Sequence, residues 1–229
     1  LSQISIKSQP LGDPRADRVS RIARSKEVPE TLKAWKGSSR VVVAGSSWPP
    51  EEKALSNLEW DETTKLILAP HNIDNGHVTS VLNLFNSSAS NSPRAMLYSE
   101  WASSMNCHDT TSPAILIIDS IGLLSSLYAL ADLAVIGGGF GAGIHNLLEP
   151  AAHGVPMISG PNIGRFREAV KLQYTHSLVI CHNQSLLSQT ISSSLESDNT
   201  LKLSQTGQLA KDWVESQSGC AEKIAQLLP

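Results

Sequence analysis

A glycine-rich segment carries the clearest chemical signal in this sequence of 229 residues. Five of the seven positions from Gly137 to Gly143 are glycine, which indicates a backbone that bends tightly and lies against a ligand. The residues from His145 to His153 have helical spacing, and Gly154 suits the end of that helix. Because free backbone N–H groups and the helix dipole both attract negative charge, such a loop leading into a helix is typical of an anion-binding site.

Two polar residues of this predicted helix fit two different roles. Asn146-x-x-Glu149 matches a capping box, in which the Asn side chain caps the helix and the carboxylate accepts a hydrogen bond from the cap's own N–H. In the other role, Glu149 accepts hydrogen bonds from the two hydroxyls of a ribose, as acidic residues do in other nucleotide folds. The pattern leaves both roles open. His145 lies four residues before Glu149, but two such ligands without a third do not predict a metal site.

Three further turns offer groups that suit an anionic ligand. Ser46 and Ser47 precede two prolines, so they fit either the start of a helix, with Ser47 as its N-cap, or a carboxylate or phosphate site. His71 follows an apolar run, where its imidazole serves either as a phosphate ligand or as an ordinary packed or surface residue. Gly122 favours either turn geometry or the close approach of a ligand to the start of the next helix.

Short apolar runs alternate with helical periods from residue 40 onward and position these turns. The runs predict seven strands, at Arg40–Ala44, Lys65–Ala69, Ala95–Ser99, Ala114–Ile118, Leu133–Ile136, Val155–Ser159 and Leu178–Cys181. Their consecutive apolar residues are expected where both faces of a sheet are buried. Helices are predicted over residues 16–25, 78–85, 123–131 and 166–172, with two or three more from residue 186 onward. The alternation predicts an α/β fold, a Rossmann-like doubly wound parallel sheet, with ligands bound beyond the carboxyl ends of the strands.

Composition and charge argue against several classes of protein. The formal net charge of −3 does not favour a nucleic-acid partner or a polybasic membrane patch. The three cysteines are widely spaced, which argues against a zinc ribbon or a disulfide framework and favours a reducing compartment. No apolar run approaches the roughly 18–20 residues of a membrane span. Residues 1–39 are polar and interrupted by prolines, so we expect a linker and the tail of a missing N-terminal domain there, and one domain over residues 40–229.

Taken in order along the chain, these turns resemble the C-terminal half of the 3-deoxy-D-manno-octulosonic acid (Kdo) transferases. The resemblance covers most of residues 11–175, and the combination is more specific than any single segment. The matching segments are Gly12–Arg15, Ala44–Pro49, Ala69–His71, Ile118–Tyr128, Gly137–Glu149, Gly160–Asn162 and Phe166–Ala169.

The resemblance implies a GT-B glycosyltransferase, with two Rossmann-like domains and an active site in the cleft between them. This family transfers Kdo from CMP-Kdo to the lipid A precursor in lipopolysaccharide biosynthesis, at the cytoplasmic face of the bacterial inner membrane. Its C-terminal domain holds the CMP donor. We therefore expect CMP-Kdo as the donor substrate, the lipid A precursor as the acceptor, and neither a cofactor nor a metal.

The resemblance also implies a set of donor-binding residues. These are Ser46, Ser47, His71, Gly122, Gly138, Gly139, Asn146 and Glu149. Within this set, Glu149 binds the ribose and His71 adjoins the phosphate. Many members carry Pro-Arg-His where His71 here directly follows Pro70, so a permanent guanidinium for the phosphate is missing. Many also carry Gly-Glu where this chain has Gly122-Leu123.

The family's membrane anchor, acceptor-binding domain and catalytic carboxylate all lie upstream of the matching segments. No residue of this chain is therefore expected to act as the catalytic base, which inverting sugar transfer requires beside the acceptor hydroxyl. Two alternatives remain open from the sequence. One is a GT-B transferase or an epimerase that uses a UDP-sugar, and the other is a stand-alone, non-catalytic nucleotide-binding domain.

Overall fold

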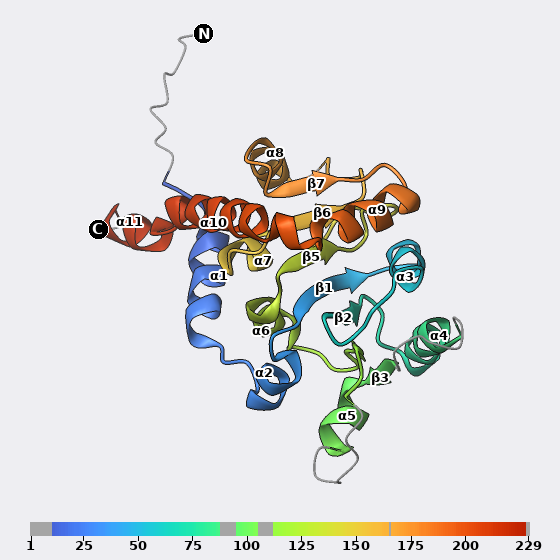
Figure 1. Cartoon of the computed structure of the whole chain (residues 1–229). Helices are drawn as coiled ribbons and strands as arrows, with labels where there is room; N and C mark the ends of the chain where they lie inside the picture. The colour runs from blue at the N-terminus through green and yellow to red at the C-terminus, as the bar shows by residue number, and fades with distance from the viewer. Residues whose placement is uncertain (1–10, 88–94, 105–111, 165, 228–229) are drawn as a thin grey trace.

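The computed structural model describes residues 11–87, 95–104, 112–164 and 166–227, and its centre is a parallel sheet of seven strands (Figure 1). The strand order is β3-β4-β2-β1-β5-β6-β7. The strands are β1 (Arg40–Ser47), β2 (Thr64–Pro70), β3 (Ala95–Leu97), β4 (Ile115–Ile117), β5 (Leu133–Ile136), β6 (Met157–Ser159) and β7 (Leu178–Ile180). The seven predicted strands and the parallel, doubly wound sheet are thereby confirmed.

The order of the strands reverses beside β1. The chain builds β2, β3 and β4 on one side of β1 and then returns to place β5, β6 and β7 on the other. Val42 of β1 accordingly pairs with Leu66 of β2 on one side and with Leu133 of β5 on the other. In an open α/β sheet such a reversal leaves a crevice beyond the carboxyl ends of the two strands, which is where ligands bind.

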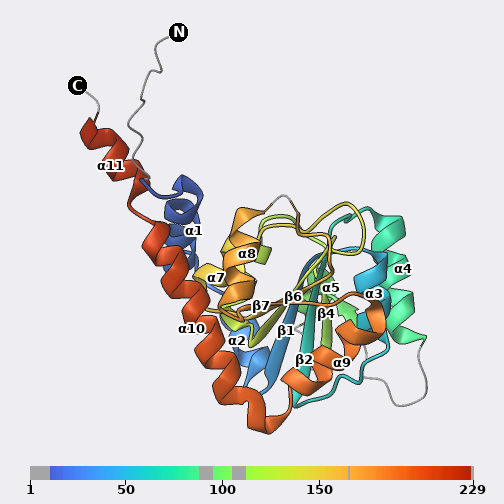
Figure 2. The same cartoon turned by 90° about the horizontal axis from the view of Figure 1, so that it is seen from above.

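Helices cover both faces of the sheet (Figures 1 and 2). One face is packed by α1 (Pro14–Ser25), α2 (Glu30–Lys36), α5 (Tyr98–Ser104), α6 (Leu124–Leu127) with the 3₁₀ turn Tyr128–Leu130, α7 (Leu148–Ala152), α8 (Arg167–Tyr174) and α10 (Thr200–Gln217). The other face is packed by α3 (Pro49–Ser56), α4 (Asn75–Asn86) and α9 (Gln184–Ser194). Val41 and Val43 enter the first core and Val42 and Ala44 the second, which confirms that both faces are buried.

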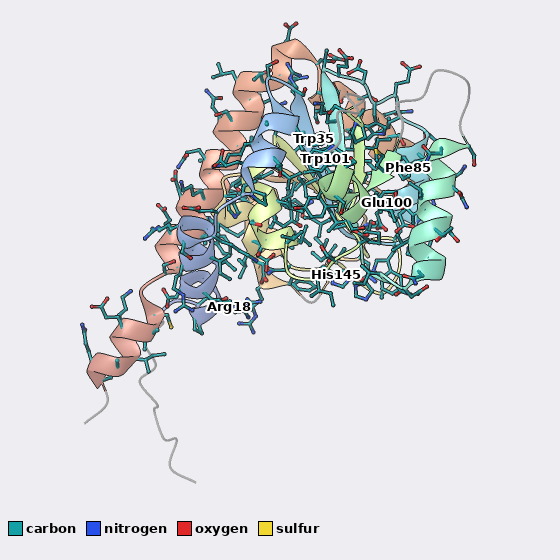
Figure 3. All side chains as sticks on the ribbon, turned by 90° about the horizontal axis from the view of Figure 1, so that it is seen from below. Arg18, Trp35, Phe85, Glu100, Trp101 and His145 are labelled. Carbon is teal, nitrogen blue, oxygen red and sulfur yellow. The ribbon has the colours of Figure 1, made fainter. Side chains whose placement is uncertain are left out.

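The first helix, α1, agrees with the helix predicted over residues 16–25, but the packing of α1 and α2 corrects our expectation that this region is a polar linker. Asp13 caps α1, since its carboxylate accepts a hydrogen bond of 2.9 Å from the N–H of Arg15. The helix buries Ala16 and Val19 in the core. In α2, Trp35 is 4% exposed and packs edge-on against Trp101, with 6.4 Å between ring centroids (Figure 3). Both helices therefore belong to the domain itself.

The helix predicted over residues 145–153 is shorter than expected. The N–H groups of Ile144 and His145 donate across the loop, to the carbonyls of Asn162 at 3.2 Å and Gly137 at 3.3 Å, so the helix begins only at Leu148. Gly154 follows its C-cap with a positive φ of 75°, as predicted. The tail forms three helices, because α11 (Cys220–Leu227) continues beyond α10.

Candidate functional site

A cavity of about 390 Å³ lies beyond the carboxyl ends of the central strands. Its volume falls within the roughly 300–1,000 Å³ of small-molecule sites. Figure 2 shows the loops after β5 and β6 together at this edge of the sheet, between α8 and α4. The lining residues come from three of the predicted turns and from the loop after β6: Trp48, His71, Ala142, Gly143, Ile144, His145, Asn162 and Phe166. A smaller cavity of about 210 Å³ lies at the opposite edge, beneath α9 and α10, and contains none of the predicted site residues.

Three rings form a column in the wall of the larger cavity. Trp48 and His71 are stacked, with 4.6 Å between centroids and 16° between planes. His71 and His145 follow at 4.5 Å and 33°. The indole N–H of Trp48 donates a hydrogen bond of 3.2 Å to Nε2 of His145. Burial, followed by the nearby His71, lowers the pKa of the half-buried His145 imidazole.

The two serines at the end of β1 do not reach the cavity wall. Ser47 is 1% exposed, and its hydroxyl donates to Oε1 of Glu52 at 3.1 Å, while its carbonyl accepts from the N–H of His71 at 2.9 Å. The N-cap of α3 is Trp48 rather than Ser47, and Glu51 accepts from the Trp48 N–H at 3.2 Å. Ser46 has a positive φ of 52° and does not line the cavity. The Ser47 hydroxyl therefore acts through its contacts with the protein.

Three of the glycines are explained by backbone packing. A Cβ atom on Gly137 would lie 1.9 Å from the carbonyl oxygen of Ser46. On Gly138, which has φ of 88°, it would lie 2.3 Å from the carbonyl oxygen of Gly143, and on Gly139 it would lie 2.4 Å from the backbone nitrogen of Gly160. The segment therefore bends tightly, as we predicted, but the space freed at these three positions is filled by other backbone segments.

Gly122 differs from those glycines. Its φ is 94°, and a Cβ atom there would meet nothing within 4 Å. The ammonium of Lys26 holds this turn, since it donates to the carbonyl of Gly122 and to the hydroxyl of Ser125, the latter at 2.9 Å. The turn thus presents an open backbone surface, which keeps both of its sequence-based roles possible. It does not line the 390 Å³ cavity.

Asn146 and Glu149 form only half of the predicted capping box. Oδ1 of Asn146 accepts a hydrogen bond of 2.9 Å from the N–H of Leu148. The carboxylate of Glu149 is half-buried, and among the described residues it makes no hydrogen bond or ion pair. Burial, and secondarily the charge of Glu149, raises the pKa of the buried Tyr128 hydroxyl, so these two groups lie near each other. Since α7 begins at Leu148, His145 and Glu149 do not share a helix face as the sequence pattern suggested.

Of the eight predicted residues, the cavity wall contains only His71. The structure adds Trp48, His145, Asn162 and Phe166, which the sequence reasoning did not assign to the site. These four belong to the segments that resemble the family, and only Trp48 directly follows a strand.

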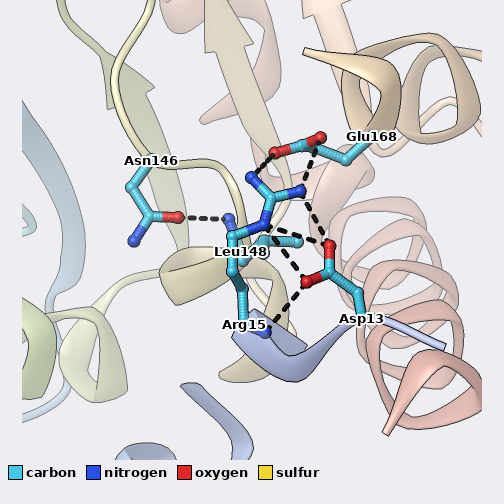
Figure 4. A network of polar contacts seen from close by, with 5 residues as sticks. All are labelled: Asp13, Arg15, Asn146, Leu148 and Glu168. Atoms are coloured by element: carbon cyan, nitrogen blue, oxygen red, sulfur yellow. Dashed lines mark hydrogen bonds and ion pairs between the residues drawn. The ribbon is translucent and has the colours of Figure 1, made fainter. Parts of the chain in front are cut away.

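An ionic cluster links α1 to the helix that follows the cavity (Figure 4). The guanidinium of Arg15 bonds both oxygens of Glu168, at 3.0 and 3.3 Å, and the carboxylate of Asp13, at 2.7 Å. Glu168 is 5% exposed. Hydrogen bonding to Arg15 lowers the pKa of the Asp13 carboxyl. Figure 4 shows this cluster beside Asn146 and Leu148, so α1, α7 and α8 meet at one point.

Two further observations concern the part of the chain that the structure describes. It contains no group of three or more His, Cys, Asp or Glu side chains that could hold a metal ion. In the same residues no helix is both long enough and apolar enough to cross a membrane.

Sequence comparison finds similar proteins among the 3-deoxy-D-manno-octulosonic acid transferases. The 3-deoxy-D-manno-octulosonic acid transferase of Rickettsia typhi is 32% identical over 183 residues, which is 77% of this chain and 37% of that protein. The probable mitochondrial enzyme of the same name from Arabidopsis thaliana is 36% identical over 109 residues, 46% of this chain and 24% of that protein. The chain belongs to the Kdo transferase family. No protein-family model matches it.

Two solved structures share the fold of this chain. The C-terminal CMP-Kdo binding domain of WaaA from Acinetobacter baumannii matches with a TM-score of 0.61 and 21% identity, over 84% of this chain and 97% of that domain. WaaG, a glycosyltransferase involved in lipopolysaccharide biosynthesis, matches with a TM-score of 0.51 and 14% identity. The fold is therefore that of the C-terminal domain of GT-B glycosyltransferases. Because the chain spans only about a third or less of the Rickettsia and Arabidopsis Kdo transferases, it corresponds to part of such an enzyme.

Proposed function

We propose that this chain is the donor-binding domain of a Kdo transferase and that its donor is CMP-Kdo. The observation that carries the proposal is the cavity at the strand reversal, with two imidazoles in its wall. CMP-Kdo carries two anionic groups, a phosphate and a sugar carboxylate, and imidazole side chains can donate hydrogen bonds to both. The relatives that share this sequence pattern are named as Kdo transferases, which supports the same donor.

Within this proposal the predicted residues take separate parts of the donor. His71 contacts the phosphate, since its ring is exposed and lies in the cavity wall. Glu149 accepts hydrogen bonds from the ribose hydroxyls, because its carboxylate has no partner among the described residues and a neutral diol avoids repulsion with the phosphate. The open backbone of Gly122 and the amide of Asn146 lie against the nucleotide. Ser46, Ser47, Gly138 and Gly139 shape the loops that carry these groups.

The rest of the reaction needs groups from outside this chain. We propose that the intact protein transfers Kdo to the lipid A precursor at the cytoplasmic face of the bacterial inner membrane, with the acceptor and the catalytic base held by a preceding domain. On this proposal, purified chain 1–229 binds CMP but transfers no sugar, and it gains transfer activity only when the upstream domain is restored.

Nucleotide binding to the purified chain tests the proposal. A ligand at a hundred times its dissociation constant stabilises a protein by about 2.7 kcal/mol, which for a domain of this size raises Tm by about 5–10 °C. CMP should produce a shift of this order, and the variant His71→Gln should reduce it. The matched control is His182→Gln, at an exposed histidine outside the cavity.

The competing donor class gives a different result in the same assay. A UDP-forming trehalose-phosphate synthase from Burkholderia vietnamiensis shares the fold, with a TM-score of 0.54 at 9% identity. Stabilisation by UDP but not by CMP would overturn the Kdo assignment and favour a UDP-sugar. Stabilisation by neither nucleotide would overturn nucleotide binding by this domain.

A further inference from the structure

The hydrogen bond between Trp48 and His145 determines which ring nitrogen of His145 carries a proton. An indole N–H donates and cannot accept. In the contact of 3.2 Å, Nε2 of His145 must therefore be the acceptor, without a proton of its own. The proton of the neutral imidazole then resides on Nδ1, and protonation of Nε2 would require the loss of this hydrogen bond.

Trp48 is itself held in place by two contacts. Its backbone N–H donates to Oε2 of Glu51, and its ring is stacked on His71. Glu51 is 1% exposed, and burial raises the pKa of its carboxyl group. Both contacts orient the indole N–H towards His145, so the direction of this hydrogen bond is set by the fold of the first turn of α3.

Few charged groups act on the His145 ring among the described residues. The end of β2 presents His71, whose ring centre is 4.5 Å away. The start of α3 presents Glu51, whose carboxylate is directed to the Trp48 backbone. The loop after β6 contributes Asn162 and Phe166, which are uncharged. No carboxylate therefore pairs with His145 in this part of the chain, and a second positive charge beside His71 would be opposed.

We propose that Trp48 is a positioning residue that holds His145 as the neutral Nδ1–H tautomer, so that its Nδ1–H remains available as a hydrogen-bond donor when the anionic donor substrate binds. The two imidazoles then have separate tasks. His71 donates a hydrogen bond to the phosphate, and His145 supplies a neutral N–H donor for an oxygen of the sugar. This division rests on the proposed donor function, but the tautomer itself is a property of the free protein.

Nitrogen NMR of the histidine rings tests the tautomer without any ligand. In ¹⁵N-histidine-labelled protein, His145 should show a protonated Nδ1 and an unprotonated Nε2 throughout the range from about pH 8 to 6. Trp48→Phe keeps a ring for stacking on His71 and removes the donor. In that variant the His145 tautomers should exchange, and its titration midpoint should rise by about 0.5 to 1 pH unit, as expected for the loss of one hydrogen bond. Trp213→Phe, at a partly buried tryptophan on α10, is the matched control.

Measurement of CMP affinity at several pH values separates the role of Trp48 from the proposed donor function. Trp48→Phe should change the pH dependence of CMP affinity relative to that of the wild type, because His145 can then take up a proton on Nε2 when the anion binds. A wild-type His145 that is protonated on Nε2, or unchanged nitrogen signals in Trp48→Phe, would overturn the role of Trp48 even if CMP binds. The expected tautomer without CMP binding would instead support the role of Trp48 and overturn the proposed function.

Discussion

Alanine substitutions in the glycine-rich segment test whether its glycines are required by backbone packing or by contact with a ligand. Gly137→Ala would place a Cβ atom 1.9 Å from the Ser46 carbonyl oxygen, 2.5 Å from its carbonyl carbon and 2.7 Å from Cα of Ser47. All three atoms belong to the backbone of β1, which is paired with strands on both sides and cannot move away without disturbing them. The hydrogen bond of 3.0 Å from the Gly137 N–H to the Gly45 carbonyl ties the two segments together at the same point.

The expected cost of this substitution is therefore at the upper end of the range for overpacking, about 3 kcal/mol. For a domain of this size that corresponds to a decrease in Tm of about 6–12 °C. The matched control is Gly141→Ala, where a Cβ atom would meet nothing within 4 Å. It should change the free energy of unfolding by no more than about 0.5 kcal/mol.

Urea denaturation followed by circular dichroism measures both variants directly. Equal stability of Gly137→Ala and Gly141→Ala would refute the packing explanation. Gly122→Ala extends the series, because its side chain would have open space but a backbone φ of 94°. Its cost should be intermediate, about 1–2 kcal/mol of backbone strain. A loss of CMP affinity in Gly122→Ala beyond that of Gly141→Ala would identify Gly122 as the glycine that faces the nucleotide.

Three other substitutions are tested by urea denaturation, and the first of them also by CMP affinity. Glu149→Gln should weaken CMP binding about tenfold while changing the free energy of unfolding by less than about 1 kcal/mol. A loss of stability without a change in CMP affinity would instead favour the helix-capping role of Glu149. Arg15→Met should lower the free energy of unfolding by about 1–2 kcal/mol, because it leaves the buried Glu168 unpaired while the lost guanidinium is itself 57% exposed. The control Arg24→Met removes an ion pair with both partners exposed and should lower it by less than about 0.5 kcal/mol. Equal losses of stability in the two variants would contradict this reasoning. Burial lowers the pKa of His153 from its ordinary 6.5, so the contribution of this residue to stability is complete above pH 6.5 and is lost as the pH falls through the folded-state pKa. The free energy of unfolding, measured at several pH values, should therefore fall less steeply towards acid pH in His153→Asn. An unchanged pH dependence would exclude His153 as its source.

The sheet was predictable because its signal is local. Strands such as Leu133–Ile136 are apolar at every position, and that pattern follows directly from burial on both faces. The helix predicted over residues 16–25 agrees with α1, but α2 was not predicted, since Trp35 lies in a polar stretch and its partners lie far along the chain. The spacing of apolar residues along the sequence does not reveal contacts between such distant positions.

In the candidate site, too, features with a local sequence signal were predicted and contacts between distant residues were not. His71 was found because it directly follows a strand, and the structure places it in the cavity wall. The partnership of Trp48 with His145 joins positions 97 residues apart, which no spacing rule detects. For the glycines, the sequence showed that side chains are excluded but not what excludes them. Only the coordinates distinguish the backbone that fills the space at Gly139 from the open surface at Gly122.

The contacts of α1 have a consequence for how the chain folds during synthesis. The Asp17 carboxylate accepts hydrogen bonds from the N–H groups of Gly219 and Ala221, across sequence separations of 202 and 204 residues. The N–H of Asp13 likewise donates to the carbonyl of Gln217. A ribosome that releases the chain from its N-terminus therefore exposes α1 long before α10 and α11 exist. Helix α1 must remain without these partners until translation reaches them, so its docking is a late folding event that depends on residues made about 200 positions later.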